Sequence, residues 1–230
     1  MFKEKKALLL DMNSTFMFGK NRFGENEDFS IYYRSINGEL PKDKLIQIIS
    51  AAYLFLDDKY PDEKYRHSFP TVEEAIDTVL DAELSAEEIN KIISTFAFHE
   101  FGHIPHEFVE ALKVLENRFI LSVVIDIWEP KKLCLDTFEE AGVDKLFTAS
   151  SFSSDHGMVK PSPKPFELVV SQLNLPKEEC LVVGGSVGRD LGGATAAGID
   201  CVLVGGATDP GAAGCYPGLL EFCKEIMLNS

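Results

Sequence analysis

The stretch "CLVVGGSVGRDLGGATAAGIDCVLVGG" (residues 180–206) contains two short apolar runs separated by a helical pattern. The runs "CLVVGG" (180–185) and "CVLVGG" (201–206) carry no charge, which is typical of strands buried on both faces. The segment between them (188–198) predicts a helix that leads into the second strand. Strand, helix and strand in this order predict a parallel sheet covered by helices.

Similar runs extend this pattern toward the N-terminus. Apolar stretches occur at "KALLLDMN" (6–13) and "FILSVVIDIW" (119–128), with weaker strand character at "KLFTAS" (145–150). Helical patterns lie between the later runs, at 130–142 and 162–173. This alternation predicts an α/β fold with a Rossmann-like parallel sheet as its core.

The segment between Phe16 and about Ile104 has a different pattern, with several amphipathic helices and no clear buried strand. Two capping-box patterns predict helix starts there: Thr71 with Glu74, and Ser85 with Glu88. We therefore predict an inserted α-helical cap domain, residues 16–104. The α/β core domain would then comprise residues 1–15 and 105–230.

Composition limits the class of protein. The chain has 230 residues and is 45% hydrophobic, as expected of a globular protein with a sizeable core. A formal net charge of −15 argues against non-specific binding to nucleic acid or to an anionic membrane. The five cysteines are odd in number and form no C-x-x-C pair, which favours a reducing, cytoplasmic setting. The N-terminal apolar run is too short for a signal peptide or a membrane span.

Polar residues follow the predicted strands at the edge where open α/β sheets bind ligands. They are Asp11, Asn13, Ser14, Thr15, Asp126, Ser186 and Asp190, and Lys160 lies in a Pro-rich loop before a helix. An Asp beside a Lys is suited to act as an oriented, ionised nucleophile. The alternative is a set of loop-capping carboxylates with an exposed lysine.

Four segments in order resemble the motifs of the haloacid dehalogenase superfamily. They are "ALLLDMNST", "FILSVVID", "GMVKPSPKPF" and "CLVVGGSVGRDLGGATAAGI". The helical segment after the first motif resembles the cap of subfamily I members. The resemblance covers nearly the whole chain and implies a relative of magnesium-dependent phosphatases, a superfamily that also includes dehalogenases, phosphonatases and mutases.

The resemblance implies roles for motifs one and three. Asp11 matches the nucleophile that forms an aspartyl-phosphate, and Lys160 would offset the charge of Asp11 and the phosphoryl group. The second motif-one Asp, which protonates the leaving group, is replaced by Asn13, whose carboxamide cannot exchange a proton near neutral pH. Positioned acid–base catalysis contributes roughly 10²–10⁴-fold. Ser14 and Thr15 complete the motif as candidate phosphate-binding residues.

Motif two departs further from the family pattern. Its phosphate-binding Ser or Thr is matched by Ile125, which offers no hydrogen bond. The next residue is Asp126, which would repel a phosphate unless a cation lies between them. The metal-free dehalogenases also lack the second motif-one Asp, but they rely on a Ser-Asn pair that Ile125 and Asp126 do not supply. We therefore rank a dehalogenase below an altered phosphatase.

Motif four has lost its first Asp, which is replaced by Gly185, whereas Asp190 is kept and Ser186 is a candidate phosphate-binding residue. The implied magnesium ligands are Asp11, the backbone carbonyl of Asn13, and Asp190. Magnesium favours octahedral oxygen coordination with one or two protein carboxylates. A site with one carboxylate fewer would bind Mg²⁺ more weakly.

Two functions follow from this mixture. One is a slow or altered hydrolase of a small phosphorylated or otherwise activated compound, which the retained Asp11 and Lys160 favour. The other is a non-catalytic small-ligand-binding or regulatory protein, which Asn13 and Gly185 favour. Efficient phosphatase turnover is not expected in either case.

The stretch "AFHEFGHIP" (97–105) offers a third interpretation, because His99, Glu100 and His103 match the H-E-x-x-H zinc signature of metallopeptidases. Zinc needs a third protein ligand and a helix that presents both imidazoles. Pro105 disfavours helical geometry at the residue before it, and no third ligand has a recognisable spacing. We instead predict that this stretch links the cap to the first core helix.

Overall fold

The core of the chain is a parallel sheet built from strands that are far apart in sequence. The computed structural model describes residues 2–19, 21–24, 26–81 and 83–228. Within these residues the strands are β1 (Ala7–Leu10), β2 (Ile120–Ile125), β3 (Phe147–Phe152), β4 (Cys180–Gly184), β5 (Asp200–Leu203) and β6 (Gly214–Cys215). Their spatial order is β3-β2-β1-β4-β5-β6, and every pairing is parallel.

Strand β1 lies in the middle of the sheet, because Leu8 pairs with Leu121 of β2 and with Leu181 of β4. Successive side chains of a strand point to opposite faces. Leu8 and Leu10 accordingly pack into one hydrophobic cluster, while Ala7 and Leu9 pack into another. Burial on both faces explains why this strand has an uninterrupted apolar sequence.

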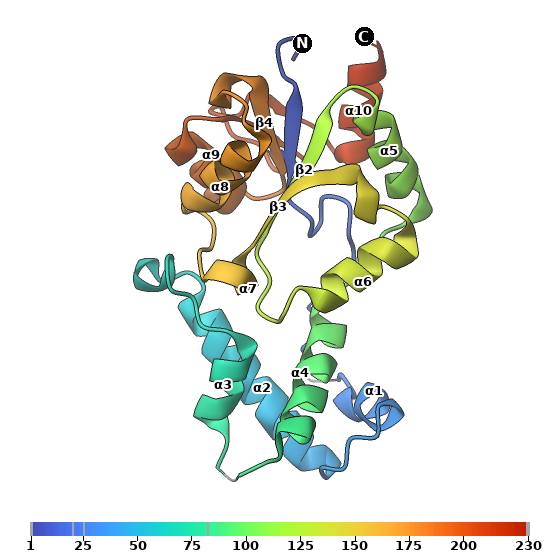
Figure 1. The fold of residues 1–230 in the computed structure, drawn as a ribbon, viewed down its shortest axis with the longest axis vertical. Helices are drawn as coiled ribbons and strands as arrows, with labels where there is room; N and C mark the ends of the chain where they lie inside the picture. Colours follow the sequence, from blue (N-terminus) through green and yellow to red (C-terminus); the bar gives the residue numbers. More distant parts are fainter. Residues whose placement is uncertain (1, 20, 25, 82, 229–230) are drawn as a thin grey trace.

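Helices cover both faces of the sheet (Figure 1). On one face lie α5 (His106–Glu116), α6 (Lys132–Ala141) and α10 (Leu219–Leu228), and on the other α8 (Lys164–Leu173) and α9 (Gly192–Ala197). Short segments complete the core: α7 (Ser153–His156), 3₁₀ turns η2 (Asp144–Leu146) and η3 (Lys177–Glu179), and the π-helical turn η4 (Val187–Leu191). The predicted α/β fold with a Rossmann-like parallel sheet is confirmed.

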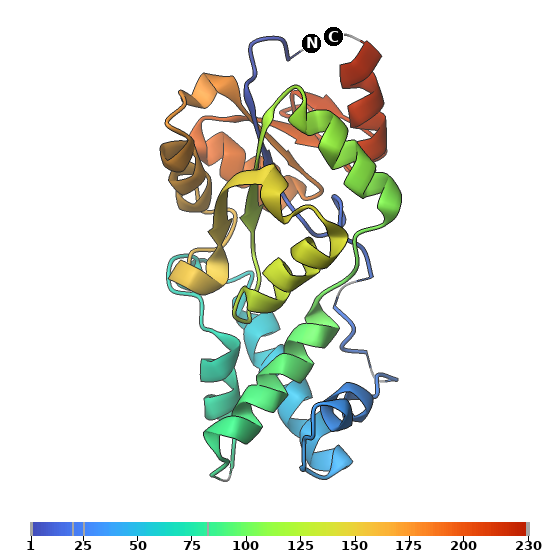
Figure 2. The same cartoon turned by 45° about the vertical axis from the view of Figure 1, so that its right-hand side comes forward.

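A second group of helices forms its own hydrophobic cluster beside the carboxyl ends of the strands (Figures 1 and 2). We call it the helical unit: α1 (Phe29–Ser35), α2 (Lys42–Lys59), η1 (Glu63–Tyr65), α3 (Val72–Val79) and α4 (Ala86–Glu100). Its cluster also takes in Val159, and Trp128 packs against it. The helical unit is therefore packed directly against loops that follow core strands.

Of the two predicted capping boxes, the one at Thr71 and Glu74 forms in full. At Ser85, the side chain accepts from the Glu88 N–H, but Glu88 does not return the bond. The Glu88 carboxylate instead accepts from the Tyr33 hydroxyl and the Glu39 N–H, because the fold brings these two donors next to it. Strand β6 was not predicted from sequence, because it is only two residues long.

None of the helices in the described residues is both long enough and apolar enough to span a membrane.

Candidate active site

Five segments meet at the carboxyl ends of β1, β2 and β4, where parallel strands place the residues that follow them at one edge. They enclose a polar cavity of about 140 Å³. Its lining residues are Asp11, Asn13, Ser14, Tyr60, Asp126, Lys160, Gly185, Ser186, Arg189 and Asp190. All of these come from the core except Tyr60, which follows α2 of the helical unit.

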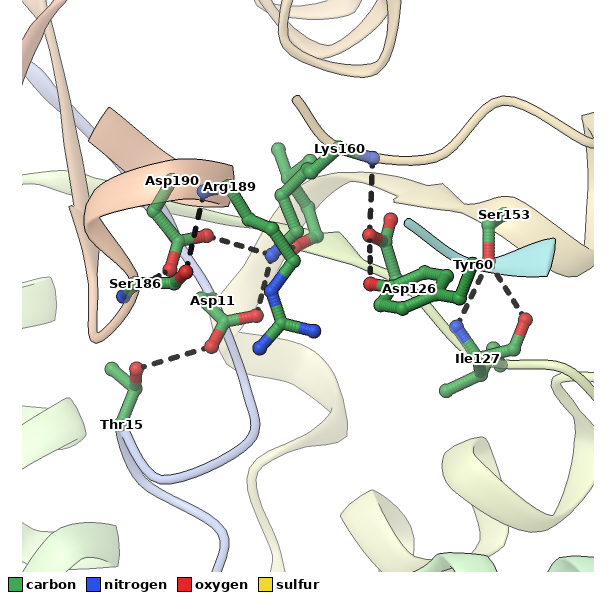
Figure 3. A network of polar contacts seen from close by, with 11 residues as sticks. Asp11, Thr15, Tyr60, Asp126, Ile127, Ser153, Lys160, Ser186, Arg189 and Asp190 are labelled. Carbon is green, nitrogen blue, oxygen red and sulfur yellow. Dashed lines mark hydrogen bonds and ion pairs between the residues drawn. The ribbon is translucent and has the colours of Figure 1, made fainter. Parts of the chain in front are cut away.

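The ammonium group of Lys160 lies between two carboxylates (Figure 3). Lys160 Nζ is 2.6 Å from Asp11 Oδ1 and 2.8 Å from Asp190 Oδ1, and it also donates to the Val124 carbonyl at 3.3 Å. Burial disfavours the charged ammonium, but Asp11, Asp190 and the nearby Asp126 outweigh it and hold the pKa of Lys160 well above its usual value. Lys160 is therefore a fixed positive charge that orients Asp11.

The turn after β1 positions Asp11 and its neighbours. Asp11 N–H donates to the Val183 carbonyl, which ties the residue to β4. Ser14 adopts a positive φ of 61°, so the chain turns back sharply. Thr15 is buried, and its Oγ1 donates to Asp11 Oδ2 at 3.4 Å. Asn13 Oδ1 is buried without a hydrogen-bond partner among the described residues, so it can accept a bond from a ligand or water.

The turn after β4 holds Asp190 in place. The backbone N–H of Ser186 donates to Asp190 Oδ2 at 2.9 Å, while Asp190 Oδ1 accepts from Lys160. A Cβ at Gly184 would lie 2.4 Å from the Asp190 carboxyl carbon, so glycine is required for this close approach. A Cβ at Gly185 would meet nothing nearer than the Val204 carbonyl oxygen at 3.6 Å. The missing side chain at Gly184 therefore allows Asp190 to pack against the strand, whereas the missing side chain at Gly185 leaves space beside the cavity.

Asp126 connects the core to the helical unit. Its Oδ2 accepts from the Tyr60 hydroxyl at 2.6 Å and from the Lys160 backbone N–H at 3.0 Å (Figure 3). Its Oδ1 is buried and has no partner within the described part of the chain. Burial raises the pKa of the Asp126 carboxyl, although Lys160 and Tyr60 oppose that shift.

Arg189 brings a second positive charge to the cavity. Its guanidinium carbon is 5.3 Å from the centroid of the Tyr60 ring, a cation–π distance. Burial disfavours the charged form, but Tyr60, Asp190 and Asp11 outweigh it and raise the pKa of Arg189. With Lys160, this guanidinium offsets the negative charge of Asp11 and Asp190 at the cavity.

Most, but not all, of the site residues predicted from the sequence line the cavity. Asp11, Asn13, Ser14, Asp126, Lys160, Ser186 and Asp190 all line the cavity. Thr15 lies behind Asp11, and Ile125 is 1% exposed in the hydrophobic core and does not line the cavity. Ile125, at the position of the family's phosphate-binding Ser or Thr, therefore faces the core and not the cavity, because the alternation of the strand turns its side chain inward.

Two lining residues were not predicted from sequence. Arg189 lies directly before Asp190 in the fourth motif, so its basic side chain was a signal available there. Tyr60 carries no local signal, because it reaches Asp126 only through the packing of the helical unit, 66 residues away in sequence.

The H-E-x-x-H stretch does not form a zinc site in the described chain. Helix α4 ends at Glu100, so His103 lies outside it and instead pairs through its backbone with Phe18. The buried His99 ring is bonded to the Thr95 carbonyl through Nδ1 at 2.8 Å, and burial lowers the pKa of His99. No group of three or more metal-ligating side chains is present among the residues described.

The implied magnesium ligands also fit poorly. Asp190 uses one carboxylate oxygen for Lys160 and the other for the Ser186 N–H. Position 185 is a glycine and offers no side-chain oxygen. Asp11 is engaged in the same way, because its Oδ1 accepts from Lys160 and its Oδ2 from Thr15. A Mg²⁺ ion, which is usually held by one or two protein carboxylates, would therefore compete with Lys160 for both of them. The positive charge in this site instead comes from Lys160 and Arg189.

The chain is similar to known proteins in both sequence and structure. A family model of haloacid dehalogenase-like hydrolases matches residues 5–198. Pyrophosphatase PpaX of Halalkalibacterium halodurans is 30% identical over 129 residues, which are 53% of this chain and 59% of that protein. The aligned region thus spans less than two thirds of this curated relative.

Solved structures resemble the whole chain. The HAD-hydrolase YfnB from Bacillus subtilis, solved bound to magnesium, has a TM-score of 0.63 at 18% identity and covers 99% of this chain and 100% of its own. A 2-haloacid dehalogenase from Pseudomonas syringae has a TM-score of 0.65 at 17% identity and covers 98% and 100%. At these identities the likeness concerns the fold.

Proposed function

We propose, from the premise that this chain belongs to the haloacid dehalogenase-like hydrolase family, that it slowly hydrolyses a small phosphorylated compound with Asp11 as the nucleophile. The observation that carries the proposal is the 2.6 Å ion pair between Lys160 Nζ and Asp11 Oδ1 in a polar cavity. A neighbouring cation favours the ionised form of a carboxyl group and fixes its orientation, as a nucleophile requires.

The proposed reaction has two steps. An Asp11 oxygen attacks phosphorus, the bond to the leaving oxygen breaks, and water then attacks the aspartyl-phosphate to release phosphate. Lys160 and Arg189 offset the negative charge that the phosphoryl oxygens bring beside Asp11. Thr15 supports the orientation of Asp11 through its bond to Oδ2.

Slow turnover follows from three positions. Asn13 cannot transfer a proton, Ile125 cannot hydrogen-bond the phosphoryl group, and Gly185 cannot ligate a metal. Magnesium supplies charge stabilisation and orientation when it is bound in such enzymes, and we expect its affinity for this chain to be weak.

The cavity favours a compact substrate. Its volume of about 140 Å³ is well below the roughly 300–1,000 Å³ of pockets that bury a drug-sized ligand. A phosphoryl group with a short leaving group matches that size better than a nucleotide. We further propose that residues 16–104 act as the cap that limits substrate size, with Tyr60 at the cavity as its contact. The relative PpaX is named a pyrophosphatase, which makes pyrophosphate a reasonable first substrate.

A phosphate-release assay tests the proposal. The panel is pyrophosphate, acetyl phosphate and p-nitrophenyl phosphate, each with Mg²⁺ and with EDTA. We expect slow release, little change on chelation, and loss of release in Asp11→Asn. Release that survives Asp11→Asn would overturn the assignment of the nucleophile, and fast Mg²⁺-dependent release would overturn the expectation of slow turnover.

Restoring the missing carboxylates tests the cause of slow turnover. The double variant Asn13→Asp with Gly185→Asp has space, because a Cβ at 185 makes only ordinary contact. We expect Mg²⁺ binding by calorimetry to become measurable and phosphate release to increase by roughly 10²-fold or more. Unchanged rates in a variant that binds Mg²⁺ would place the limitation elsewhere, for example at Ile125.

A non-catalytic binding protein is the second candidate, and it is favoured by Asn13 at the cavity, whose buried Oδ1 has no hydrogen-bond partner among the described residues. A carboxamide accepts and donates hydrogen bonds without titrating, as a recognition site requires. Calorimetry with orthophosphate in EDTA separates the two candidates. Tight binding without any turnover across the panel would favour recognition, and chloride release from 2-chloropropionate would instead indicate the lower-ranked dehalogenase.

A further inference from the structure

The proposed hydrolysis needs a proton donor that its first motif does not supply. Departure of an alkoxide or phenoxide leaving group is helped by proton transfer from a positioned acid. Asn13 stands where a carboxyl would be expected, and its amide cannot do this. If Asp11 is the nucleophile, as the proposed function has it, another group at the cavity must carry the transferable proton.

The hydrogen bonds of Asp126 are compatible with a neutral carboxylic acid. Its Oδ2 accepts from the Tyr60 hydroxyl at 2.6 Å and from the Lys160 N–H at 3.0 Å. Its Oδ1 is buried and accepts no bond from the described residues, and Asp126 is one of the residues that line the cavity. A protonated carboxyl has one accepting oxygen and one donating hydroxyl, and Oδ1 is the oxygen that these contacts leave for the proton.

The surroundings of Asp126 support this protonation state. Burial raises the pKa of Asp126, and the negative charge of Asp190 acts in the same direction. Lys160 and the Tyr60 hydroxyl act against it without reversing it. A carboxyl with a raised pKa in a partly apolar setting is the form in which enzymes keep a general acid near neutral pH.

We propose that Asp126 is the general acid and base of this site and performs the proton transfers that Asn13 cannot. In the first step an Asp11 oxygen bonds to phosphorus, the bond to the leaving oxygen breaks, and that oxygen takes the proton of Asp126 Oδ1. In the second step water attacks phosphorus and gives a proton to the Asp126 carboxylate. The phosphorus–Asp11 bond breaks, its electron pair returns to Asp11, and phosphate leaves.

Leaving-group dependence tests the assignment. Phenyl phosphate needs protonation of its leaving oxygen far more than p-nitrophenyl phosphate does. We expect Asp126→Asn to lower kcat for phenyl phosphate by roughly 10²–10⁴-fold and to change kcat for p-nitrophenyl phosphate much less. Asp144→Asn, at an exposed position, is the matched control and should change neither.

The outcomes separate this inference from the proposed function. An equal loss on both phosphates would mean that Asp126 binds the phosphoryl group, and the acid role would be overturned. Activity that persists in Asp11→Asn would instead refute the nucleophile. A second measurement needs no turnover: infrared difference spectra of wild type and Asp126→Asn should contain the C=O stretch of a protonated carboxyl at neutral pH. Its absence would overturn the inference.

Discussion

Lys160 is the residue on which the geometry of the site depends most, because its ammonium group separates two buried carboxylates. Asp190 is 3% exposed at its side chain, as is Lys160, while Asp11 is 14% exposed. Breaking a buried ion pair by removing one partner leaves an uncompensated charge, which is far more costly than losing a surface pair.

We predict that Lys160→Met lowers the free energy of unfolding by about 3–5 kcal/mol near neutral pH and abolishes turnover. Urea unfolding near neutral pH measures the loss, with the exposed Lys164→Met as the control. A Lys160→Met protein as stable as that control would contradict a stabilising role for the buried ammonium group.

Asp126 gives a second prediction, in the dependence of stability on pH. Its pKa is raised in the folded protein by burial, so the folded state holds the proton more tightly than the unfolded chain. The resulting stability is full below the unfolded-chain pKa of about 4 and is lost as the pH rises through the raised value. Asp126→Asn cannot ionise and should escape this loss.

Thermal unfolding from about pH 4 to about pH 9 compares the two proteins. The stability of wild type relative to Asp126→Asn should fall with rising pH, by about 1.4 kcal/mol for each pH unit by which the pKa is raised. Parallel curves over this range would contradict a raised pKa at Asp126.

At the scale of elements, the end of β4 shows how backbone packing sets a side chain. Gly184 and Gly185 are adjacent, yet only the first is in contact with Asp190. The turn η4 then returns Asp190 toward Lys160 through the Ser186 N–H. Strand β4 and the turn η4 thus together fix the position of the Asp190 carboxylate.

Alanine at these two glycines should separate the roles. We predict that Gly184→Ala displaces Asp190, lowers stability by about 1–3 kcal/mol through overpacking and reduces turnover. Gly185→Ala should be close to neutral, because its Cβ would be 3.6 Å from the nearest atom. Melting temperatures and Asp11-dependent phosphate release are measured for both variants. Equal effects of Gly184→Ala and Gly185→Ala would show that the turn can shift to relieve the contact with Asp190.

At the scale of the whole molecule, the helical unit and the core meet around the cavity. Backbone hydrogen bonds join Phe69 to Gly157, Val72 to Trp128 and Val159 to Arg66. Tyr60 adds a side-chain bond to Asp126 and stacks with Arg189. Because these contacts line or adjoin the cavity, any movement of the helical unit would open it.

Tyr60→Phe should loosen this junction without removing the ring. We predict a loss of about 1 kcal/mol, the usual net contribution of one hydrogen bond, and faster amide hydrogen exchange at residues 126–130 and 157–160. Tyr32→Phe, whose ring stacks on Phe98 within the helical unit, is the control and should leave both segments unchanged. Unaltered exchange in Tyr60→Phe would mean that the backbone bonds hold the junction alone.

The sequence by itself determined strands β1 to β5, their parallel arrangement and the candidate cluster of Asp11, Lys160 and Asp190. These depend on apolar runs and on the residues directly following them, and parallel strands bring such residues to one edge. The perfect H-E-x-x-H match was misleading, since chain direction after Glu100 depends on the pairing of Phe18 with His103.

Only the tertiary structure decided what surrounds that cluster. Tyr60 reaches Asp126 across 66 residues, Ile125 turns into the core, and Asp126 keeps one oxygen for two donors and the other without a partner in the described chain. Burial and long-range contacts set the charge state of a side chain, and neither is encoded in the residues beside it. The raised pKa of Asp126 is therefore a property of the packed molecule.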